Sequence, residues 1–301
     1  MRIVLAGGSG FLGGALEAVL TQQGHSVALL TRSPKPETTN QIAWTPDGSA
    51  GSWVKQLTGT DAIVNLAGEG IADRRWTDER KRTLRNSRLL PTRSLVAAMR
   101  QLSPAPTVFV SQSGINFYGP RGSDLTTEST AAGSDFLAGL CVEWEQEAEQ
   151  ASSFTRVVTL RTSPVLSHSG GVMGKMLLPF RFGVGGPFGD GAQYMPWVHM
   201  KDWLDLVLWF LTNDRTRGAF NATAPGPVTN REFARTLGRV LHRPAFIPVP
   251  GVALRLMVGE LAEILLTGQR AVPARAEEMG FRFAFPQLEP ALRDLLGRGK
   301  T

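Results

Sequence analysis

Three glycines near the start of the chain have a spacing that suits the binding of phosphate groups. Gly7, Gly10 and Gly13 lie between a short apolar run, Arg2–Ala6, and a segment of helical periodicity, Phe11–Gln23. In such a turn the first glycine allows a sharp bend, the second lets the backbone approach a pyrophosphate, and the third lets the helix pack closely on the strand. The free N–H groups of the first helical turn then face the phosphates. The alternative is an ordinary glycine-rich turn. The predicted cofactor-binding residues here are Gly7, Gly10, Phe11, Leu12 and Gly13.

The end of the next apolar run indicates which dinucleotide is bound. Ser26–Thr31 reads as a second strand, and Arg32 follows it directly. An acidic residue at this point would bind the ribose diol of NAD, whereas an arginine can pair with the 2′-phosphate of NADP. Thr31 and Arg32 are therefore predicted to bind NADP(H), the alternative being that Arg32 is a solvated loop residue.

Strands that alternate with helices must position these residues. Strands are predicted at Arg2–Ala6, Ser26–Thr31, Ile42–Trp44, Asp61–Leu66, Thr107–Ser111 and Arg156–Arg161, and helices at Phe11–Gln23, Thr77–Gln101 and Gly133–Ala151. This alternation predicts an α/β fold of the Rossmann type, a doubly wound parallel sheet. Its right-handed crossovers place helices on both faces of the sheet.

The pattern changes after residue 166, where a glycine-rich stretch begins. Helices are predicted at Lys201–Thr212, Asn230–Leu241 and Val252–Leu266, with a short strand at Phe246–Val249. We expect a Rossmann domain over residues 1–166, joined by about 197–223. Residues 167–196 and 224–301 are expected to form a smaller C-terminal α+β lobe that closes over the cofactor.

Composition excludes several classes of site. The chain has 301 residues, 42% of them hydrophobic, and a formal charge of +6. The single cysteine excludes an intrachain disulfide, and the four histidines are scattered without metal-ligand spacing, so no metal site is expected. The basic residues are spread along the chain rather than gathered in an arm, which argues against nucleic acid. No apolar stretch is long enough for a membrane span, and the N-terminus lacks a signal peptide, so a cytoplasmic protein is expected.

With the glycine turn in place, the chain resembles the extended short-chain dehydrogenase/reductase superfamily over nearly its whole length. More narrowly, it is similar to the atypical epimerase family branch, which carries a C-terminal lobe like the domain DUF1731. The matching segments are Asn65–Glu69, Arg75–Thr77, Lys81, Ser87–Arg88, Gly185–Pro187, Trp197–His199, Asp202, Asn221–Pro225, His242–Pro244 and Gly268–Arg270.

This resemblance implies further cofactor contacts. Leu66 and Ala67 would pass under the adenine and ribose side of the cofactor, and Arg88 would reach the bound dinucleotide. Val165 would lie near the nicotinamide. Without the resemblance, Arg88 could equally be a surface helix charge, and Val165 a core residue.

The chain departs from the superfamily at the catalytic positions. Most members use a serine and a Tyr-x-x-x-Lys pair, in which the tyrosine transfers a proton and the lysine lowers its pKa. Ser113 fits the serine, which would bind a substrate oxygen. Leu137 and Cys141 stand in the two other slots. Tyr118 is the remaining candidate acid, with a packing role as its alternative.

The second lobe shows another departure. Met195 occupies the position where nucleotide-sugar epimerases usually place an arginine for the substrate diphosphate, so a nucleotide sugar is a poor candidate substrate. His199 invites a general-base reading, but its place beside Asp202, the expected N-cap of the next helix, favours a structural role between the lobes.

Two functions follow. The first is an NADP(H)-binding oxidoreductase or epimerase-like enzyme that acts on an unidentified small carbonyl or hydroxyl substrate. The second, motivated by the missing Tyr-Lys pair, is a catalytically inactive NADP-binding sensor or scaffold. Partners other than a small molecule are not expected, except for a possible homodimer through the helices Thr77–Gln101 and Gly133–Ala151.

Overall fold

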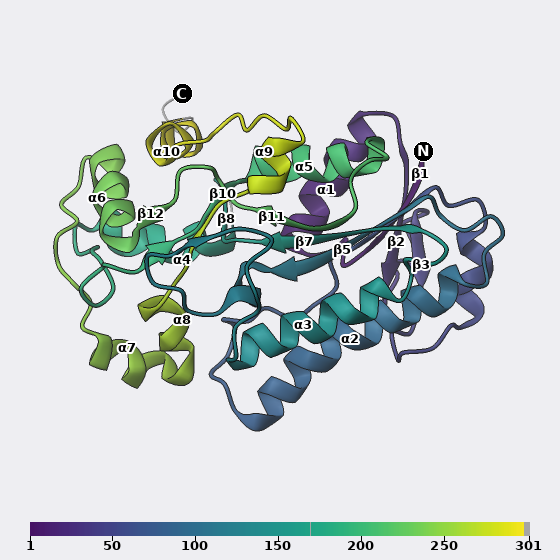
Figure 1. Cartoon of the computed structure of the whole chain (residues 1–301), viewed down its shortest axis with the longest axis horizontal. Helices are drawn as coiled ribbons and strands as arrows, with labels where there is room; N and C mark the ends of the chain where they lie inside the picture. Colours follow the sequence, from purple (N-terminus) through teal and green to yellow (C-terminus); the bar gives the residue numbers. More distant parts are fainter. Residues whose placement is uncertain (169, 298–301) are drawn as a thin grey trace.

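A parallel sheet of seven strands forms the centre of the computed structural model, which describes residues 1–168 and 170–297 (Figure 1). The strand order is β11-β7-β5-β4-β1-β2-β3. The strands are β1 (Arg2–Ala6), β2 (Ser26–Thr31), β3 (Gln41–Ala43), β4 (Ala62–Asn65), β5 (Val108–Gly114), β7 (Arg156–Thr162) and β11 (Gly218–Ala222). All six pairings in this sheet are parallel. The predicted Rossmann-type fold is confirmed.

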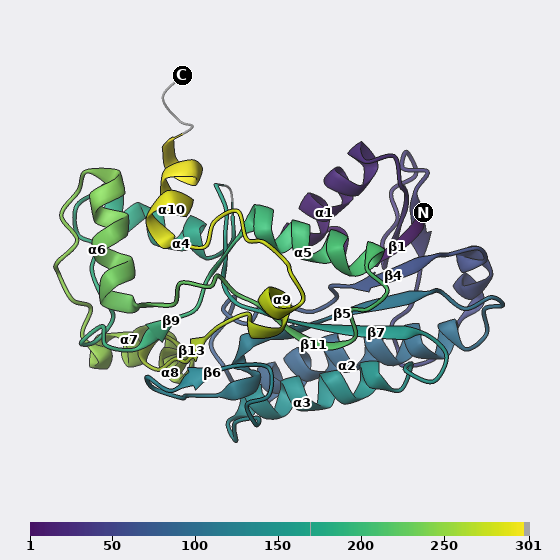
Figure 2. The same ribbon diagram turned by 45° about the horizontal axis from the view of Figure 1, so that its top comes forward.

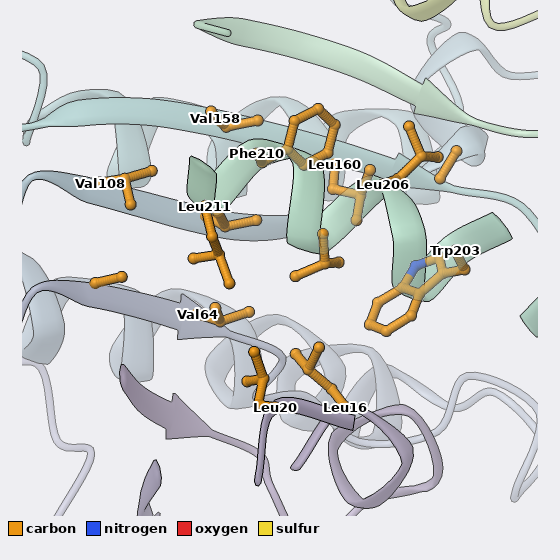
Figure 3. Close-up of a cluster of buried hydrophobic side chains, with 14 of the residues drawn as sticks. Leu16, Leu20, Val64, Val108, Val158, Leu160, Trp203, Leu206, Phe210 and Leu211 are labelled. Carbon is orange, nitrogen blue, oxygen red and sulfur yellow. The ribbon is translucent and has the colours of Figure 1, made fainter. Parts of the chain in front are cut away.

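Helices cover both faces of this sheet (Figure 2). Helices α1 (Phe11–Gln22) and α5 (Met200–Thr212) lie on one face, and α2 (Asp78–Met99) and α3 (Phe136–Glu149) on the other. Because side chains alternate along a strand, each strand supplies both layers. In β1, Ile3 and Leu5 pack with α1 and α5, whereas Val4 and Ala6 join the opposite core. The first of these cores, with Trp203 and Phe210 of α5, is shown in Figure 3.

The two long helices begin at polar caps. The Thr77 hydroxyl accepts the N–H of Arg80 at the start of α2. The Asp135 carboxylate accepts N–H bonds at the start of α3. The sixth predicted strand is β7, but β11 was not predicted, because its sequence, Gly-Ala-Phe-Asn-Ala, contains no β-branched residue. Its place is set by pairing with β7 at the sheet edge.

Most of the remaining elements form a second body beyond the carboxyl ends of the strands (Figure 1). Its helices are α4 (Gly171–Arg181), α6 (Asn230–Leu241), α7 (Gly251–Val258), α8 (Ala262–Leu266) and α10 (Leu288–Gly297). Its short strands are β6 (Leu125–Thr126), β8 (Val165–Leu166), β9 (Tyr194–Met195), β10 (Val198–His199), β12 (Val228–Thr229) and β13 (Arg270–Ala271). The short helix α9 (Ala274–Glu278) instead packs against β11, and its Ala276 joins the core between α1 and α5. Single 3₁₀ turns occur at η1 (Ser52–Leu57), η2 (Ile115–Tyr118) and η3 (Gly259–Leu261).

Three predictions for this part of the chain were wrong. The segment Phe246–Val249 is not a strand, since only Val249 forms an isolated bridge, to Phe188. The expected helix Val252–Leu266 is interrupted at Gly259, whose φ of +64° ends α7. Helix α4 lies inside the glycine-rich stretch, where no helix was predicted. The division of the chain into two domains stays a prediction.

Two expected absences can be examined in residues 1–168 and 170–297. No helix in these ranges has both the length and the apolar character that a membrane crossing requires. The same residues bring together no group of three His, Cys, Asp or Glu side chains suited to a metal ion.

Candidate functional site

A cleft of about 740 Å³ opens at the carboxyl ends of β1, β2 and β4. This edge of a parallel sheet, beside the first strand, is where open α/β folds bind ligands. Of the predicted cofactor residues, the cleft is lined by Gly7, Gly10, Thr31, Arg32, Leu66 and Ala67. Its other walls include Trp44 and Pro46 after β3, and Thr83, Asn86, Ser87 and Leu90 of α2.

The glycine turn has the geometry that the sequence predicts. Gly7 has a φ of +81°, and a Cβ there would lie 2.6 Å from the Leu66 carbonyl oxygen. A Cβ on Gly13 would lie 2.3 Å from the Gly7 oxygen, so α1 packs directly on the turn. Helix α1 has no side-chain cap and no acidic residue in its first turn. Its first N–H groups and its dipole can therefore receive an anion.

Arg32 is the residue directly after β2, and it lines the cleft. Its side chain is exposed, and no carboxylate among the described residues pairs with it. Next to it, the Thr31 hydroxyl accepts the N–H of Ser33 at 3.3 Å, which shapes the turn after the strand. A guanidinium without a partner at the rim of a cleft is suited to a phosphate.

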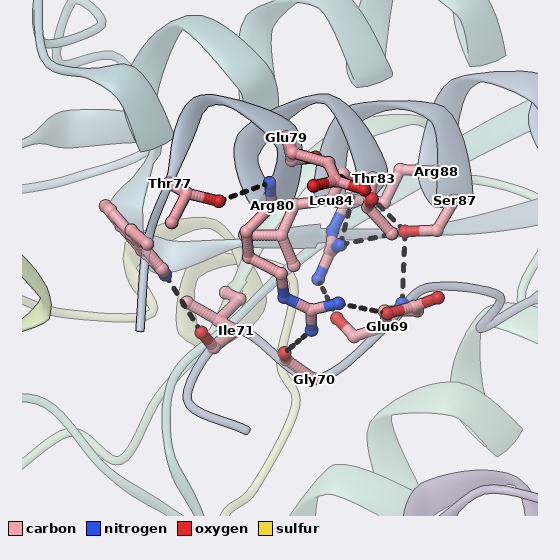
Figure 4. A network of polar contacts seen from close by, with 11 residues as sticks. Glu69, Gly70, Ile71, Thr77, Glu79, Arg80, Thr83, Leu84, Ser87 and Arg88 are labelled. Atoms are coloured by element: carbon pink, nitrogen blue, oxygen red, sulfur yellow. Dashed lines mark hydrogen bonds and ion pairs between the residues drawn. The ribbon is translucent and has the colours of Figure 1, made fainter. Parts of the chain in front are cut away.

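Arg88 lies beneath the cleft rather than in its wall (Figure 4). Its guanidinium donates to the carbonyl of Glu69 at 2.9 Å and to that of Leu84 at 3.0 Å, and it lies 5.3 Å from the Trp144 ring. Burial lowers the pKa of Arg88. A second arginine, Arg80, pairs with the Glu69 carboxylate. The two arginines fasten the loop after β4 that lines the cleft, and direct contact of Arg88 with a dinucleotide stays a prediction.

The other predicted contacts lie deeper or at the rim. Phe11 is 38% exposed, and its ring lies beneath Gly170 and Gly171, where added Cβ atoms would approach it to 3.0 Å. Leu12 packs against the core between α1 and α5. Val165 belongs to the same core, with 7% of its surface exposed.

Ser113 and Tyr118 belong to a buried polar network instead of lining the cleft. The Ser113 hydroxyl donates to Glu145 of α3 at 2.7 Å. Arg161 of β7 donates twice to the same carboxylate, at 2.8 and 2.7 Å, and donates to the Tyr118 hydroxyl at 2.9 Å. That hydroxyl in turn donates to Asn221 at 2.7 Å. Both hydroxyl protons are thus engaged inside the protein.

The electrostatics of this network oppose proton transfer. Burial raises the pKa of Tyr118 to about 12, although Arg161 beside it acts in the other direction. Burial also raises the pKa of the Cys141 thiol to about 11, so it stays protonated. Sequence reasoning missed Arg161 and Asn221 as members. The signal available was the charged Arg161 directly after Val157–Leu160, the inner part of a predicted buried strand, which indicates a buried ion pair.

Comparison with known proteins decides the family. The model of the NAD dependent epimerase/dehydratase family matches residues 3–223, and the domain of unknown function DUF1731 matches residues 249–295. The chain belongs to the NAD dependent epimerase/dehydratase family. It is 38% identical to human epimerase family protein SDR39U1 over 98% of this chain and 100% of the relative. It is 34% identical to the Bacillus subtilis protein YfhF over the full length of both.

Solved structures agree with this assignment. The human SDR39U1 structure, determined with NADPH, aligns with a TM-score of 0.92 at 37% identity and covers 99% of both chains. A nucleoside-diphosphate sugar epimerase from Corynebacterium glutamicum aligns at 0.80 and 32% identity, over 99% of this chain and 58% of that one.

In this member of the epimerase/dehydratase family, His199 and Asp202 join α5 to the C-terminal segment. The N-cap of α5 is His199, whose Nδ1 accepts the Lys201 N–H at 3.1 Å, so the prediction that Asp202 is the cap was wrong. Asp202 instead accepts the N–H groups of Ala284 and Phe285, at 2.6 and 3.0 Å. The His199 ring stacks on Phe285 with 3.9 Å between centroids. His199 is thus the N-cap of α5 and stacks on Phe285, and its role between two lobes stays a prediction.

Proposed function

We propose that this protein binds NADP(H) across the carboxyl edge of its sheet. The pyrophosphate would lie at the start of α1, where Gly10 would let the backbone approach it closely and where Gly7 and Gly13 allow the tight packing of the turn. The 2′-phosphate would pair with Arg32, which is the single observation that carries the choice of NADP over NAD. The NADPH in the human relative supports the same cofactor. When bound, the cofactor supplies hydride chemistry, and the residues described above bind and orient it.

Replacement of Arg32 tests this proposal. A charge-assisted hydrogen bond contributes about 1.5–3 kcal/mol, so Arg32→Ala should weaken NADPH binding roughly 10–150-fold. NADH has no 2′-phosphate, and its affinity should change less than about twofold. Titration calorimetry measures both, with Arg82→Ala, an exposed arginine of α2 outside the cleft, as the control. Equal losses for the two coenzymes would refute the assignment.

We further propose that the bound cofactor is not turned over through Ser113 and Tyr118. Both hydroxyls are nearly inaccessible, at 1% and 0% exposure, and both donate to internal acceptors. This observation favours a binding protein, a sensor or scaffold, over an oxidoreductase with the usual proton donor. An enzyme acting on a small carbonyl or hydroxyl compound is the second candidate, which the family membership favours.

A reductase assay separates the two candidates. NADPH is incubated with the protein and a panel of aldehydes, ketones and quinones, and absorbance at 340 nm is followed. Tight binding without oxidation across the panel is the expected result. Substrate-dependent oxidation that disappears in Ser113→Ala would support the enzyme instead, provided that calorimetry shows unchanged NADPH affinity in the variant.

A further inference from the structure

Gln112 of β5 is a polar side chain on a face of the sheet that is otherwise apolar. Its neighbours Ser111 and Ser113 alternate to the opposite face, where Ser113 contacts Glu145 of α3. Gln112 therefore shares the face of Val108 and Val110, which belong to the core between α1 and α5. This is also the face on which the glycine turn enters α1.

The strand register places Gln112 beside a residue that lines the cleft, although Gln112 is not itself one of the lining residues. Asn65 of β4 pairs with Ser111, so Leu66, which lines the cleft, is next to Gln112 in register. In the sheet, β2 ends at Arg32, β1 ends at the glycine turn, and β4 and β5 follow in order. Three strand spacings of about 4.8 Å separate β2 from β5. A dinucleotide with its 2′-phosphate on Arg32 and its pyrophosphate at the turn extends its nicotinamide half toward β5.

The amide of Gln112 lacks a partner for one of its groups. Its Oε1 atom is buried and accepts no hydrogen bond from any residue in 1–168 or 170–297, although the side chain as a whole is only half-buried. A buried carbonyl oxygen without a donor is unfavourable, and such atoms in native proteins call for a reason. A ligand that brings an N–H or O–H group to this position would satisfy the oxygen.

We propose that Gln112 binds the nicotinamide riboside half of the cofactor, with Oε1 accepting a hydrogen bond from the carboxamide N–H or a ribose O–H. The inference rests on the proposed NADP(H) binding.

Gln112→Met tests the proposal, since methionine keeps the length and removes the polar amide. NADPH affinity should fall about 10-fold, the effect of one lost hydrogen bond of about 1.4 kcal/mol. Affinity for 2′-phosphoadenosine diphosphoribose, which lacks nicotinamide but keeps the second ribose, should fall less than the affinity for NADPH when the carboxamide is the donor, and by the same factor when the ribose is the donor. The 3-acetylpyridine analogue of NADPH lacks the carboxamide N–H. A loss that disappears with this analogue identifies the carboxamide as donor, and a loss that persists identifies the ribose.

Thermal unfolding without ligand supplies the second readout. An apolar isostere removes the unpartnered oxygen, so the melting temperature of Gln112→Met should stay equal or rise. A lower melting temperature with unchanged NADPH affinity would show a purely structural role and overturn the proposal. Gln146→Met, at an exposed position of α3, controls for the substitution. If the wild type binds neither NADPH nor the diphosphoribose, the proposed function fails; if it binds both and the variant binds NADPH equally well, only the role of Gln112 fails.

Discussion

Arg161 is buried, and its removal should destabilise this protein more than the removal of an exposed arginine that also pairs with a glutamate. Its side chain and that of Glu145 are only 6% and 15% exposed, and two N–H···O bonds join them. Arg161→Met leaves the Glu145 carboxylate buried with the Ser113 hydroxyl as its remaining donor. Breaking a buried pair in this way costs about 3–5 kcal/mol. For a chain of this size the melting temperature should fall by about 5–10 °C.

The control for this experiment lies on the outer face of α2 and α3. Arg85 pairs there with Glu143, but their side chains are 46% and 42% exposed. Arg85→Met should therefore change the free energy of unfolding by no more than about 1 kcal/mol. Guanidinium unfolding followed by tryptophan fluorescence measures both variants. Adding Glu145→Gln to Arg161→Met should recover roughly half of the loss, because the uncompensated charge is gone. Equal losses for the Arg161 and Arg85 variants would refute the reasoning.

Two further predictions concern the glycine turn and the buried tyrosine. Gly13→Ala should abolish detectable NADPH binding and cost about 1–3 kcal/mol of stability, since its Cβ would meet the Gly7 oxygen at 2.3 Å. The control is Gly14→Ala, whose Cβ meets nothing closer than 3.9 Å. This variant should bind NADPH like the wild type in calorimetry, and its free energy of unfolding in denaturant should rise by about 0.5–1 kcal/mol. Tyr118 has its pKa raised to about 12 in the folded protein. A free tyrosine ionises near pH 10, so this tyrosine should reduce stability as pH rises from about 10 to 12 and leave it unaffected below that window. Tyr118→Phe should lack this loss, and the difference between the 295 nm titrations of the two proteins should show a midpoint near 12; a midpoint near 10 would contradict the burial argument.

Local sequence was sufficient to predict the glycine turn of the cofactor site, but it was not sufficient to predict the surroundings of Ser113 and Tyr118. The glycine turn could be recognised because its spacing is local: Gly13 packs on the backbone of Gly7 and Gly8, and Gly7 has a φ of +81°. The contact of Gly7 with Leu66 comes from a strand far away in the sequence and was not needed to recognise the turn. The direction of Ser113 and Tyr118 was not accessible in this way. Their partners, Glu145, Arg161 and Asn221, come from three other elements.

The N-cap of α5 shows the same limit. Both His199 and Asp202 can cap a helix, and their spacing alone does not choose between them. The outcome depends on a segment more than 80 positions later, where the N–H groups of Ala284 and Phe285 donate to the Asp202 carboxylate. Asp202 is therefore not the cap of α5. His199 is left to accept the first free N–H of α5.

The amino-acid order alone thus specified six of the seven strands of the central sheet, the long helices, the glycine turn and the arginine after β2, because periodicity and short-range sterics set these features. Tertiary structure decided which polar groups face the cleft and which face one another. Burial of Arg161 against Glu145 withdraws Ser113 and Tyr118 from the surface, and the register of β4 and β5 brings Gln112 beside Leu66. Such pairings depend on distances between elements that lie far apart along the chain, and no local pattern encodes them.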